Sequence, residues 1–385
     1  MLFSDYFFVT GIFAFNLSPF SNLHAGVPFR EPRAFTMSSS KFRFILFVLL
    51  CLAMSATFVN ATPPATDTTI TAIRYLGQAI IPHNQEFQGT IIGGLSGVDY
   101  DPEQNLYYLL SDDRSVINPV RFYTAKIEIT PTGIDAVTFQ QVFFLRQQND
   151  SLFQSPAANP SGAVDPEAIR YDQRHQQLVW TSEGERRILG DRPVLVDPEI
   201  WIADKKGKYL GHYTKPSNLK MATDKTGPRQ NSALEGLAFN NTFTKLFAAM
   251  EEPLYQDGPA ADVNRPNALT RIFEFDTHSF RNTAQYIYPL EAVAYPATPA
   301  QSFKVNGVSE IMFVRQQQLL VVERSFSTGR LSCTVKIFLV DLSKAVNVKD
   351  RLALEPQDLQ FAATKKLLFN LDDLGIYIDN VECVT

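Results

Sequence analysis

The feature that most constrains this chain is an internal repeat with four full copies and the start of a fifth. Each full copy reads as a polar or acidic residue, a short apolar run, a polar turn, a second apolar run and a polar or acidic end. The copies begin 68 to 75 positions apart, at Ser96, Glu167, Glu235, Glu310 and Glu382. Because self-similarity at a fixed period marks repeat architectures, we expect the chain to consist of repeated supersecondary units.

The turns within the copies predict that each copy forms a β-hairpin. Polar breaks such as "DPEQN" and "NNTFT" separate runs rich in β-prone residues. In an antiparallel hairpin the start of one strand lies beside the end of the next, so Glu235 and Glu251 are expected to be neighbours. The same pairing joins residues 16 positions apart in three copies and 13 apart in the fourth: Ser96 with Asp112, Glu167 with Glu183, Glu235 with Glu251, and Glu310 with Glu323.

The apolar runs predict strands that are covered on both faces, because "LYYLL", "LVWT" and "LLVV" are nearly continuous. Further β-prone segments supply outer strands, at residues 121–130, 199–214, 270–276 and 334–343. Residues 346–369 are ambiguous and fit a loop with a short helix. The expected fold class is all-β: a β-propeller of five or six blades, each a four-stranded antiparallel sheet, around a central channel.

The N-terminal part of the chain predicts export. Lys41 and Arg43 precede an apolar run, and small residues at positions 59 and 61 fit a signal-peptidase site. We interpret residues 1–36 as a non-native upstream segment, 37–61 as a signal peptide, 62–69 as a linker and 70–385 as the propeller domain. An uncleaved membrane anchor is the alternative, although the apolar run is short for a span of about 20 residues. The predicted mature protein is periplasmic or extracellular, with no stable membrane span.

Charge and motifs exclude several function classes. The net charge of −5 provides no basic surface for nucleic acid. The chain contains neither a G-x-S-x-G nucleophile elbow nor a phosphate-cradling P-loop. Beyond the predicted signal peptide the cysteines are Cys333 and Cys383, which do not make a disulfide framework, and whether they pair is left open.

The repeated acids predict a cation site where the hairpin ends converge. Carboxylates that converge without compensation repel one another, and calcium, which takes six to eight oxygen ligands, relieves that repulsion. The histidines are scattered and argue against zinc. The alternative is that each glutamate bonds backbone amides at the entry of an inner strand. The candidate calcium ligands are Asp112, Glu167, Glu235, Glu310 and Glu382, with Glu183, Glu251 and Glu323 beside them.

Residues at the ends of the copies are candidates for catalysis. Glu183 or Glu251 would act as a general base. Arg114 or Arg324 would neutralise charge that develops on a substrate, since the guanidinium group suits phosphate oxygens. The alternative for the arginines is charge balance beside the acids.

The copies contain the segments "GGLSGVDYDPEQNLYYLLSDDR", "DPEAIRYD", "NSALEGLAF" with "AAMEEPL", "GVSEIMF" with "VVERSF", and "DNVECV". In this order they resemble the family named for esterase-like activity of phytase. The resemblance covers most of residues 70–385. It implies an exported propeller-like domain with activity toward phosphate esters or other esters.

The chain departs from that family at its end. The family typically has glycine after the last glutamate and continues through another strand pair, whereas Cys383 stands here and the sequence ends at Thr385. A propeller often closes by pairing its last strands with its first. The resemblance therefore implies a C-terminally truncated product whose last blade is incomplete.

The leading hypothesis is an exported, calcium-dependent hydrolase of phosphate esters, with a small-molecule ester as its partner. The metal would polarise a phosphoryl oxygen and activate a water molecule. One alternative is a non-catalytic binding propeller that a structural cation stabilises. Another is a carboxylic-ester or lactone hydrolase on the same scaffold.

Overall fold

The structure is a computed structural model that describes residues 10–19, 70–82, 84–188 and 192–385. The predicted signal peptide and linker lie outside the described residues, as does most of the upstream segment. Strand β1 (Thr10–Pro19) pairs with β2 (Ile70–Ile81) in a two-stranded sheet. The chain divides into two compact units, and the four-stranded sheets belong entirely to the unit that contains residues 73–385.

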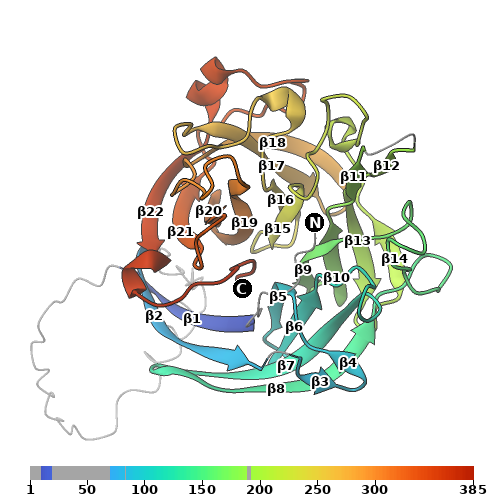
Figure 1. Ribbon diagram of the computed structural model, residues 1–385. Coiled ribbons are helices and arrows are strands. Elements are labelled where there is room, and N and C mark those ends of the chain that lie inside the picture. The colour runs from blue at the N-terminus through green and yellow to red at the C-terminus, as the bar shows by residue number, and fades with distance from the viewer. Residues whose placement is uncertain (1–9, 20–69, 83, 189–191) are drawn as a thin grey trace, which may run out of the picture. The chain divides into compact units, whose positions relative to one another are not determined.

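Four antiparallel sheets of four strands form blades 1 to 4, in chain order (Figure 1). Blade 1 contains β5 (Leu95–Asp101), β6 (Leu106–Ser111), β7 (Arg121–Thr130) and β8 (Gly133–Phe144). Blade 2 contains β9 (Pro166–Asp172), β10 (Gln177–Ser182), β13 (Glu199–Asp204) and β14 (Tyr209–His212). Blade 3 contains β15 (Leu234–Phe239), β16 (Lys245–Met250), β17 (Ala268–Asp276) and β18 (Arg281–Leu290). Blade 4 contains β19 (Lys304–Arg315), β20 (Gln318–Ser327), β21 (Thr334–Asp341) and β22 (Thr364–Asn370).

These sheets are arranged as a β-propeller. In each blade the first strand of the repeat hairpin is the innermost strand: β5, β9, β15 and β19 (Figure 1). The inner strands contact one another in chain order, β5 with β9, β9 with β15 and β15 with β19. The predicted all-β propeller of four-stranded antiparallel blades is therefore confirmed.

The number of blades differs from the prediction. The described residues form four such blades, whereas five or six were expected. The fifth repeat copy, residues 379–385, forms no strand and is too short for four strands of about five residues each. This segment instead contacts the inner strands. The Cys383 thiol lies 3.7 Å from the carbonyl oxygen of Leu95, and the Val384 carbonyl accepts a hydrogen bond from Arg170.

Contacts between neighbouring blades explain why the strands are apolar on both faces. On β10, Trp180 packs in the cluster shared with blade 1, whereas the adjacent Val179 packs in the cluster shared with blade 3. On β16, Leu246 packs toward blade 2 and Phe247 toward blade 4. Successive side chains of a strand point to opposite faces, so a blade between two others needs apolar residues at every position.

The predicted outer strands are confirmed, since residues 121–130 form β7, 199–214 contain β13 and β14, 270–276 lie in β17, and 334–343 contain β21. The ambiguous region 346–369 contains a short 3-10 helix, η3 (Pro356–Phe361). It also contains the start of β22, which the sequence reading did not predict. Most residues of β22 are exposed or half-buried, so the strand lacks a strong apolar pattern.

The remaining elements are short connections. They are β3 (Glu86–Phe87), β4 (Thr90–Ile91), β11 (Glu185–Arg187), β12 (Val194–Val196), η1 (Ser217–Leu219), η2 (Tyr255–Asp257) and η4 (Leu371–Leu374). Within the described residues, no helix is long and apolar enough to cross a membrane. Cys333 and Cys383 are free thiols.

Candidate functional site

The residue that begins each repeat copy, which we call its marker residue, lies at an irregularity of strand pairing in the inner hairpin. In blade 3, Leu234 pairs with Met250 and Gly236 pairs with Ala249, so Glu235 is the extra residue of a β-bulge. Blade 1 has the same shift around Ser96, and the pairing of β9 with β10 is irregular next to Glu167. The residues that follow the second strands of these hairpins are Asp112, Glu183 and Glu251.

In blade 4 the equivalent positions are shifted by one residue from the predicted alignment. Val308 pairs with Glu323 and Glu310 pairs with Val322, which leaves Ser309 as the extra residue. Ser309 is therefore equivalent to Glu235, and Arg324 is equivalent to Glu251. The alignment of Glu310 with Glu235 was wrong because it matched glutamates by identity, whereas the bulge fixes which residue is unpaired.

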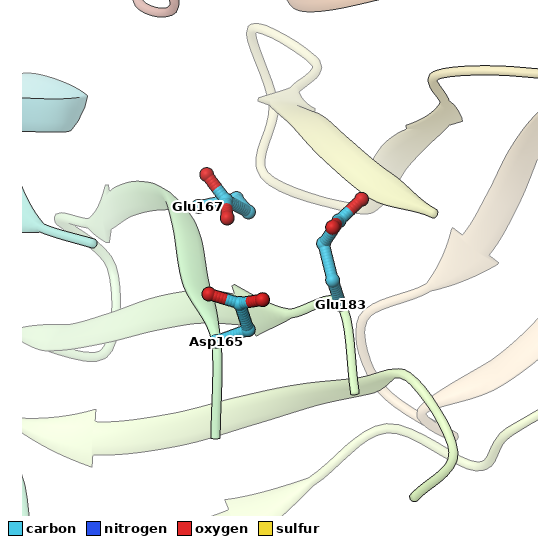
Figure 2. A group of neighbouring side chains, drawn as sticks. All are labelled: Asp165, Glu167 and Glu183. Atoms are coloured by element: carbon cyan, nitrogen blue, oxygen red, sulfur yellow. The ribbon is translucent and has the colours of Figure 1, made fainter. Parts of the chain in front are cut away.

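The first group of converging carboxylates consists of Asp165, Glu167 and Glu183. Each offers a carboxylate oxygen within 4.8 Å of the other two, and all three residues are buried. Figure 2 shows how they come together: Asp165 and Glu167 lie at the start of β9, and Glu183 follows the end of β10. We call this group the first triad.

The second group consists of Glu183, Glu235 and Glu251, and its oxygens also lie within 4.8 Å of one another. Glu183 is 1% exposed, Glu251 2% and Glu235 5%. We call this group the second triad. Glu183 belongs to both triads, so blades 2 and 3 share one continuous acidic centre.

Two arginines hold the outer acids of this centre. Nη1 of Arg114 lies 3.2 Å from Oδ2 of Asp165, and its Nη2 donates to Glu185 at 3.0 Å. Nη2 of Arg324 donates to Oε1 of Glu251 at 2.7 Å, and its Nη1 donates to Glu382 at 3.0 Å. The Nε atoms of both arginines are buried without a hydrogen-bond partner. Each arginine therefore neutralises acids and keeps one donor unused.

The carboxylate of Glu183 is only half satisfied. Its Oε1 accepts a hydrogen bond from the backbone N–H of Ala233, which precedes β15. Its Oε2 is buried and has no hydrogen-bond partner. A buried carboxylate oxygen without a donor is costly unless a cation or a proton occupies the space beside it. The donor set is made of carboxylate oxygens, so these residues fit a hard cation such as calcium.

The pKa values of the central acids reflect this crowding. Burial, followed by the charges of Glu235 and Asp165, raises the pKa of Glu167 well above its ordinary value. Burial raises the pKa of Glu183 and of Glu235 in the same way, with repulsion from neighbouring carboxylates. Burial raises the pKa of Asp165 to about 6, against the opposing effect of Arg114. Burial and mutual repulsion therefore favour the protonated forms of these acids.

Glu310 and Glu323 are used elsewhere and belong to neither triad. Oε1 of Glu310 accepts from the N–H groups of Leu237 and Ile311, and its Oε2 lies 2.7 Å from Nη2 of Arg170. This is the backbone-bonding role that was the alternative for the repeated glutamates. Glu323 accepts from the Tyr288 hydroxyl, from Asn306 and, at 2.6 Å, from Lys365.

Asp112 and Glu382 lie at the border of the acidic centre. Glu382 accepts from Arg324 and contributes charge that raises the pKa of Glu167. Burial, followed by the charges of Glu382 and Asp165, raises the pKa of Asp112 to about 8. Neither residue is a member of the two triads.

Of the predicted site residues, the triads contain Glu167, Glu183, Glu235 and Glu251, while Arg114 and Arg324 bind triad acids. Sequence reasoning missed Asp165, although it stands two positions before Glu167 in the quoted segment "DPEAIRYD". It also missed Ser309, whose buried hydroxyl has no hydrogen-bond partner. Asp165 could have been found by asking which residues flank the marker position, whereas Ser309 is identified only by the strand pairing of blade 4.

A cavity of about 180 Å³ lies further along the inner strands, away from the acids. Its lining includes Asp99, Arg170, Phe239 and Phe313. Its charged groups are already paired. Arg170 binds Glu310 and backbone carbonyls, and Asp99 accepts from the N–H of Tyr171 at 2.6 Å. We place the candidate site at the acidic centre, because unused ligand atoms are found there.

Comparison with known proteins gives one family match. No curated protein matches the chain by sequence. Among solved structures, a Bacteroides thetaiotaomicron endo-arabinase has 11% identity and a TM-score of 0.36 over 71% of this chain and 79% of its own. A periplasmic gluconolactonase from Pseudomonas aeruginosa has 10% identity and a TM-score of 0.30 over 66% and 71%. A Kuenenia stuttgartiensis hydrazine synthase has 8% identity and a TM-score of 0.28 over 64% of this chain, which spans 50% of that chain.

The family comparison covers most of the chain. The family described as "Phytase-like: Esterase-like activity of phytase" matches residues 90–385. The match includes all four blades, both triads, the two arginines and Glu382. The resemblance expected from the repeat segments is therefore confirmed, and the chain belongs to this family.

Proposed function

We propose that this protein is an exported hydrolase of phosphate esters that works with a bound divalent cation, calcium being the first candidate. The observation that carries the proposal is the unpartnered, buried Oε2 of Glu183 within the first triad. A buried carboxylate oxygen without a hydrogen-bond donor is suited to binding a cation. The family supports an ester as the substrate class.

Asp165, Glu167 and Glu183 would hold the cation through carboxylate oxygens. When bound, a divalent cation polarises a phosphoryl oxygen and makes a water molecule easier to deprotonate. The acids approach from two elements of one blade, so the blade fixes their relative positions before any ligand arrives. Such preorganisation removes the cost of assembling the site during the reaction.

The two arginines would bind the phosphoryl group. Arg114 and Arg324 each use their Nη atoms on acids and keep a buried Nε without a partner. A guanidinium donor directed at a phosphate oxygen stabilises the negative charge of the transferring group. These arginines favour a phosphate ester over an uncharged ester, because an uncharged substrate gains less from them.

Asp112 is our candidate for the proton acceptor, in place of the predicted Glu183 or Glu251, because both of those residues are members of the triads. It follows β6 at the position equivalent to Glu183 and Glu251, but it lies outside both triads and so remains unassigned to the cation. A carboxylate oxygen of Asp112 would take the proton from the attacking water. General-base catalysis contributes about 10²- to 10⁴-fold, so Asp112→Asn should lower kcat by that range and leave cation binding intact.

The test combines unfolding and turnover on one sample. We expect calcium to raise the Tm of the chelator-treated protein and to permit hydrolysis of p-nitrophenyl phosphate but not p-nitrophenyl acetate. Glu167→Gln should abolish both effects. Glu323→Gln is the matched control, because it makes the same change outside the triads. A Tm shift without turnover would favour the structural-cation alternative, and turnover of the acetate alone would favour a carboxylic-ester hydrolase.

Export is the second part of the proposal. It rests on the pattern of residues 37–61, which lie outside the described part of the chain. Expression in a host with a secretion pathway, followed by N-terminal sequencing of the exported protein, should give a chain that begins after Ala61. An intact N-terminus in the membrane fraction would favour the uncleaved anchor.

A further inference from the structure

We propose that the acidic centre binds two divalent cations and that Glu183 bridges them. The first cation is the one that the proposed function requires, in the first triad, and the inference rests on that function to this extent. The second cation lies in the second triad, between Glu183, Glu235 and Glu251. The centre would thus be binuclear, with one cation site on each side of the shared glutamate.

The geometry of the two triads carries this inference. Each triad brings three oxygens within 4.8 Å of one another, and Glu183 is the only member common to both. Sites with two metals place the ions about 3.5–4 Å apart, which is a distance that one carboxylate can bridge. The remaining members come from different blades. Asp165 immediately precedes β9 of blade 2 and Glu167 lies at its start, whereas Glu235 lies in β15 of blade 3 and Glu251 follows β16.

The bonding of Glu183 independently indicates a bridging role. Its Oε1 is fixed by the N–H of Ala233, two positions before Glu235, so the side chain reaches from blade 2 to the entry of blade 3. Its Oε2 is buried and unpartnered, in a residue that is 1% exposed. If Glu183 only stabilised blade 2, its buried and unpartnered Oε2 would be an uncompensated cost. A bridging role accounts for this oxygen, because two cations would then share the carboxylate.

The charge of the centre is also balanced more fully by two divalent cations than by one. The two arginines bind Asp165, Glu185, Glu251 and Glu382, and the centre further contains Glu167, Glu183 and Glu235. Seven carboxylates thus share two guanidinium groups, an excess of five negative charges when all are ionised. One divalent cation leaves three of these charges uncompensated, and two leave one. Uncompensated buried charge is strongly unfavourable.

Blade 4 limits the centre on the far side of the second triad. There the equivalent positions hold Ser309 and Arg324 in place of two acids. Arg324 already binds Glu251, and the Ser309 hydroxyl is buried without a partner. The structure therefore offers carboxylates for two cations across blades 2 and 3 and none for a third in blade 4.

Two bridged cations would specialise the site for phosphoryl transfer. A pair of cations at this spacing clamps both the attacking and the leaving oxygens of an in-line displacement. The substrate class would accordingly be phosphate monoesters or diesters, whose reacting group carries several oxygens for two ions. A single cation would serve other ester hydrolyses equally well.

The test measures cation stoichiometry on the full chain. Equilibrium dialysis of chelator-treated protein against Mn²⁺ should give two ions per chain, and the electron paramagnetic resonance spectrum should show two coupled Mn²⁺ ions. Glu167→Gln and Glu235→Gln should each leave one ion and remove the coupling, because each variant disables one triad. Glu183→Gln should weaken both sites. Glu323→Gln is the control and should keep two coupled ions.

The outcomes separate this inference from the proposed function. One uncoupled ion in the wild type, lost in Glu167→Gln and kept in Glu235→Gln, would overturn the second site and leave the first. No ion bound at all would overturn both. Circular dichroism of every variant in chelator checks that it is folded, and a glutamine of the same size is expected to fold, since it removes charge from a crowded centre.

Discussion

Blades 2 and 4 contain the same inner hairpin, yet opposite chemistry stands at its end. In blade 2 the bulge region and the end of the hairpin hold Glu167 and Glu183, whereas in blade 4 the bulge and the end hold Ser309 and Arg324. The backbone arrangement is shared, so the difference lies in the side chains alone. Blade 2 has carboxylates at this end of its hairpin. Blade 4 instead has Arg324, whose guanidinium group forms an ion pair with Glu251 of blade 3.

This comparison teaches that a repeat preserves positions more faithfully than residue types. Blade 4 still has acids in its hairpin, but Glu310 binds Arg170 and Glu323 binds Lys365. One position along a strand turns a side chain to the other face. Glu310 and Glu323, one residue away from the positions equivalent to Glu235 and Glu251, therefore stabilise the blades, whereas Glu235 and Glu251 belong to the acidic centre.

The largest expected effect comes from making blade 4 resemble blade 2. Arg324→Glu removes the partner of Glu251 and Glu382 and adds another acid. Breaking a buried ion pair costs about 3–5 kcal/mol, so urea unfolding in chelator should show a loss of at least that size. Arg192→Glu, at an exposed position, is the control with the same charge change. Equal stability of the two variants would contradict the assigned role of Arg324.

The acid-rich end of blade 2 should respond to pH in the cation-free protein. Folding raises the pKa of Asp165 from 3.8 to about 6, so the folded state holds more protons than the unfolded chain between these values. The stabilisation is fully present below pH 3.8 and is lost as the pH rises through about 6. A shift of two pKa units corresponds to on the order of 3 kcal/mol.

The measurement is the Tm in chelator between pH 4.5 and pH 8, which should fall as the pH rises. With saturating calcium the trend should reverse, because protons compete with the cation for the same oxygens. A Tm that rises with pH in chelator would contradict this prediction, because it would show that the charge of the ionised carboxylates is balanced by the protein itself without a cation. Blade 4 provides no opposing trend from Ser309 or Arg324, which do not titrate in this range.

Much of the fold could be predicted from the sequence, and for a local reason. The hairpins and outer strands are runs of β-prone residues between polar turns, so adjacent residues carry the signal. The blade number differs from the prediction, since the described residues form four blades and the fifth copy, residues 379–385, forms no strand. Strand β22 was missed because its half-exposed residues show no regular apolar pattern.

The candidate site was predicted where the repeat copies agree and missed where they do not. Glu167, Glu183, Glu235 and Glu251 follow from equal spacing within blades 2 and 3. Ser309 could not be recognised, because the strand pairing that defines a bulge is a tertiary property. Glu310 was predicted as a calcium ligand because it is a glutamate, like Glu235. In blade 4, however, the position equivalent to Glu235 is occupied by Ser309.

A smaller effect is expected at Glu323, which tests whether acids off the bulge have only a structural role. Glu323→Gln weakens hydrogen bonds to Lys365, Tyr288 and Asn306. Each bond to a charged group contributes about 1.5–3 kcal/mol, but glutamine keeps part of the network, so we expect a loss of about 1–2 kcal/mol in urea unfolding. Calcium affinity should not change. Weaker calcium binding would instead place Glu323 in the centre.

The smallest effect is expected at Ser309 and tests whether blade 4 supplies a cation ligand in addition to the guanidinium group of Arg324. The Ser309 hydroxyl is buried without a partner, and an unsatisfied buried polar group is unfavourable. In chelator, Ser309→Ala should therefore be neutral or should raise the free energy of unfolding by less than about 1 kcal/mol. If the hydroxyl is an additional ligand of the second cation, the same variant should lose part of the calcium-induced Tm shift. If Ser309→Ala raises the free energy of unfolding in chelator and leaves the calcium-induced Tm shift unchanged, blade 4 contributes only Arg324 to the centre. The contrast with blade 2 is then one of charge and not of ligand number.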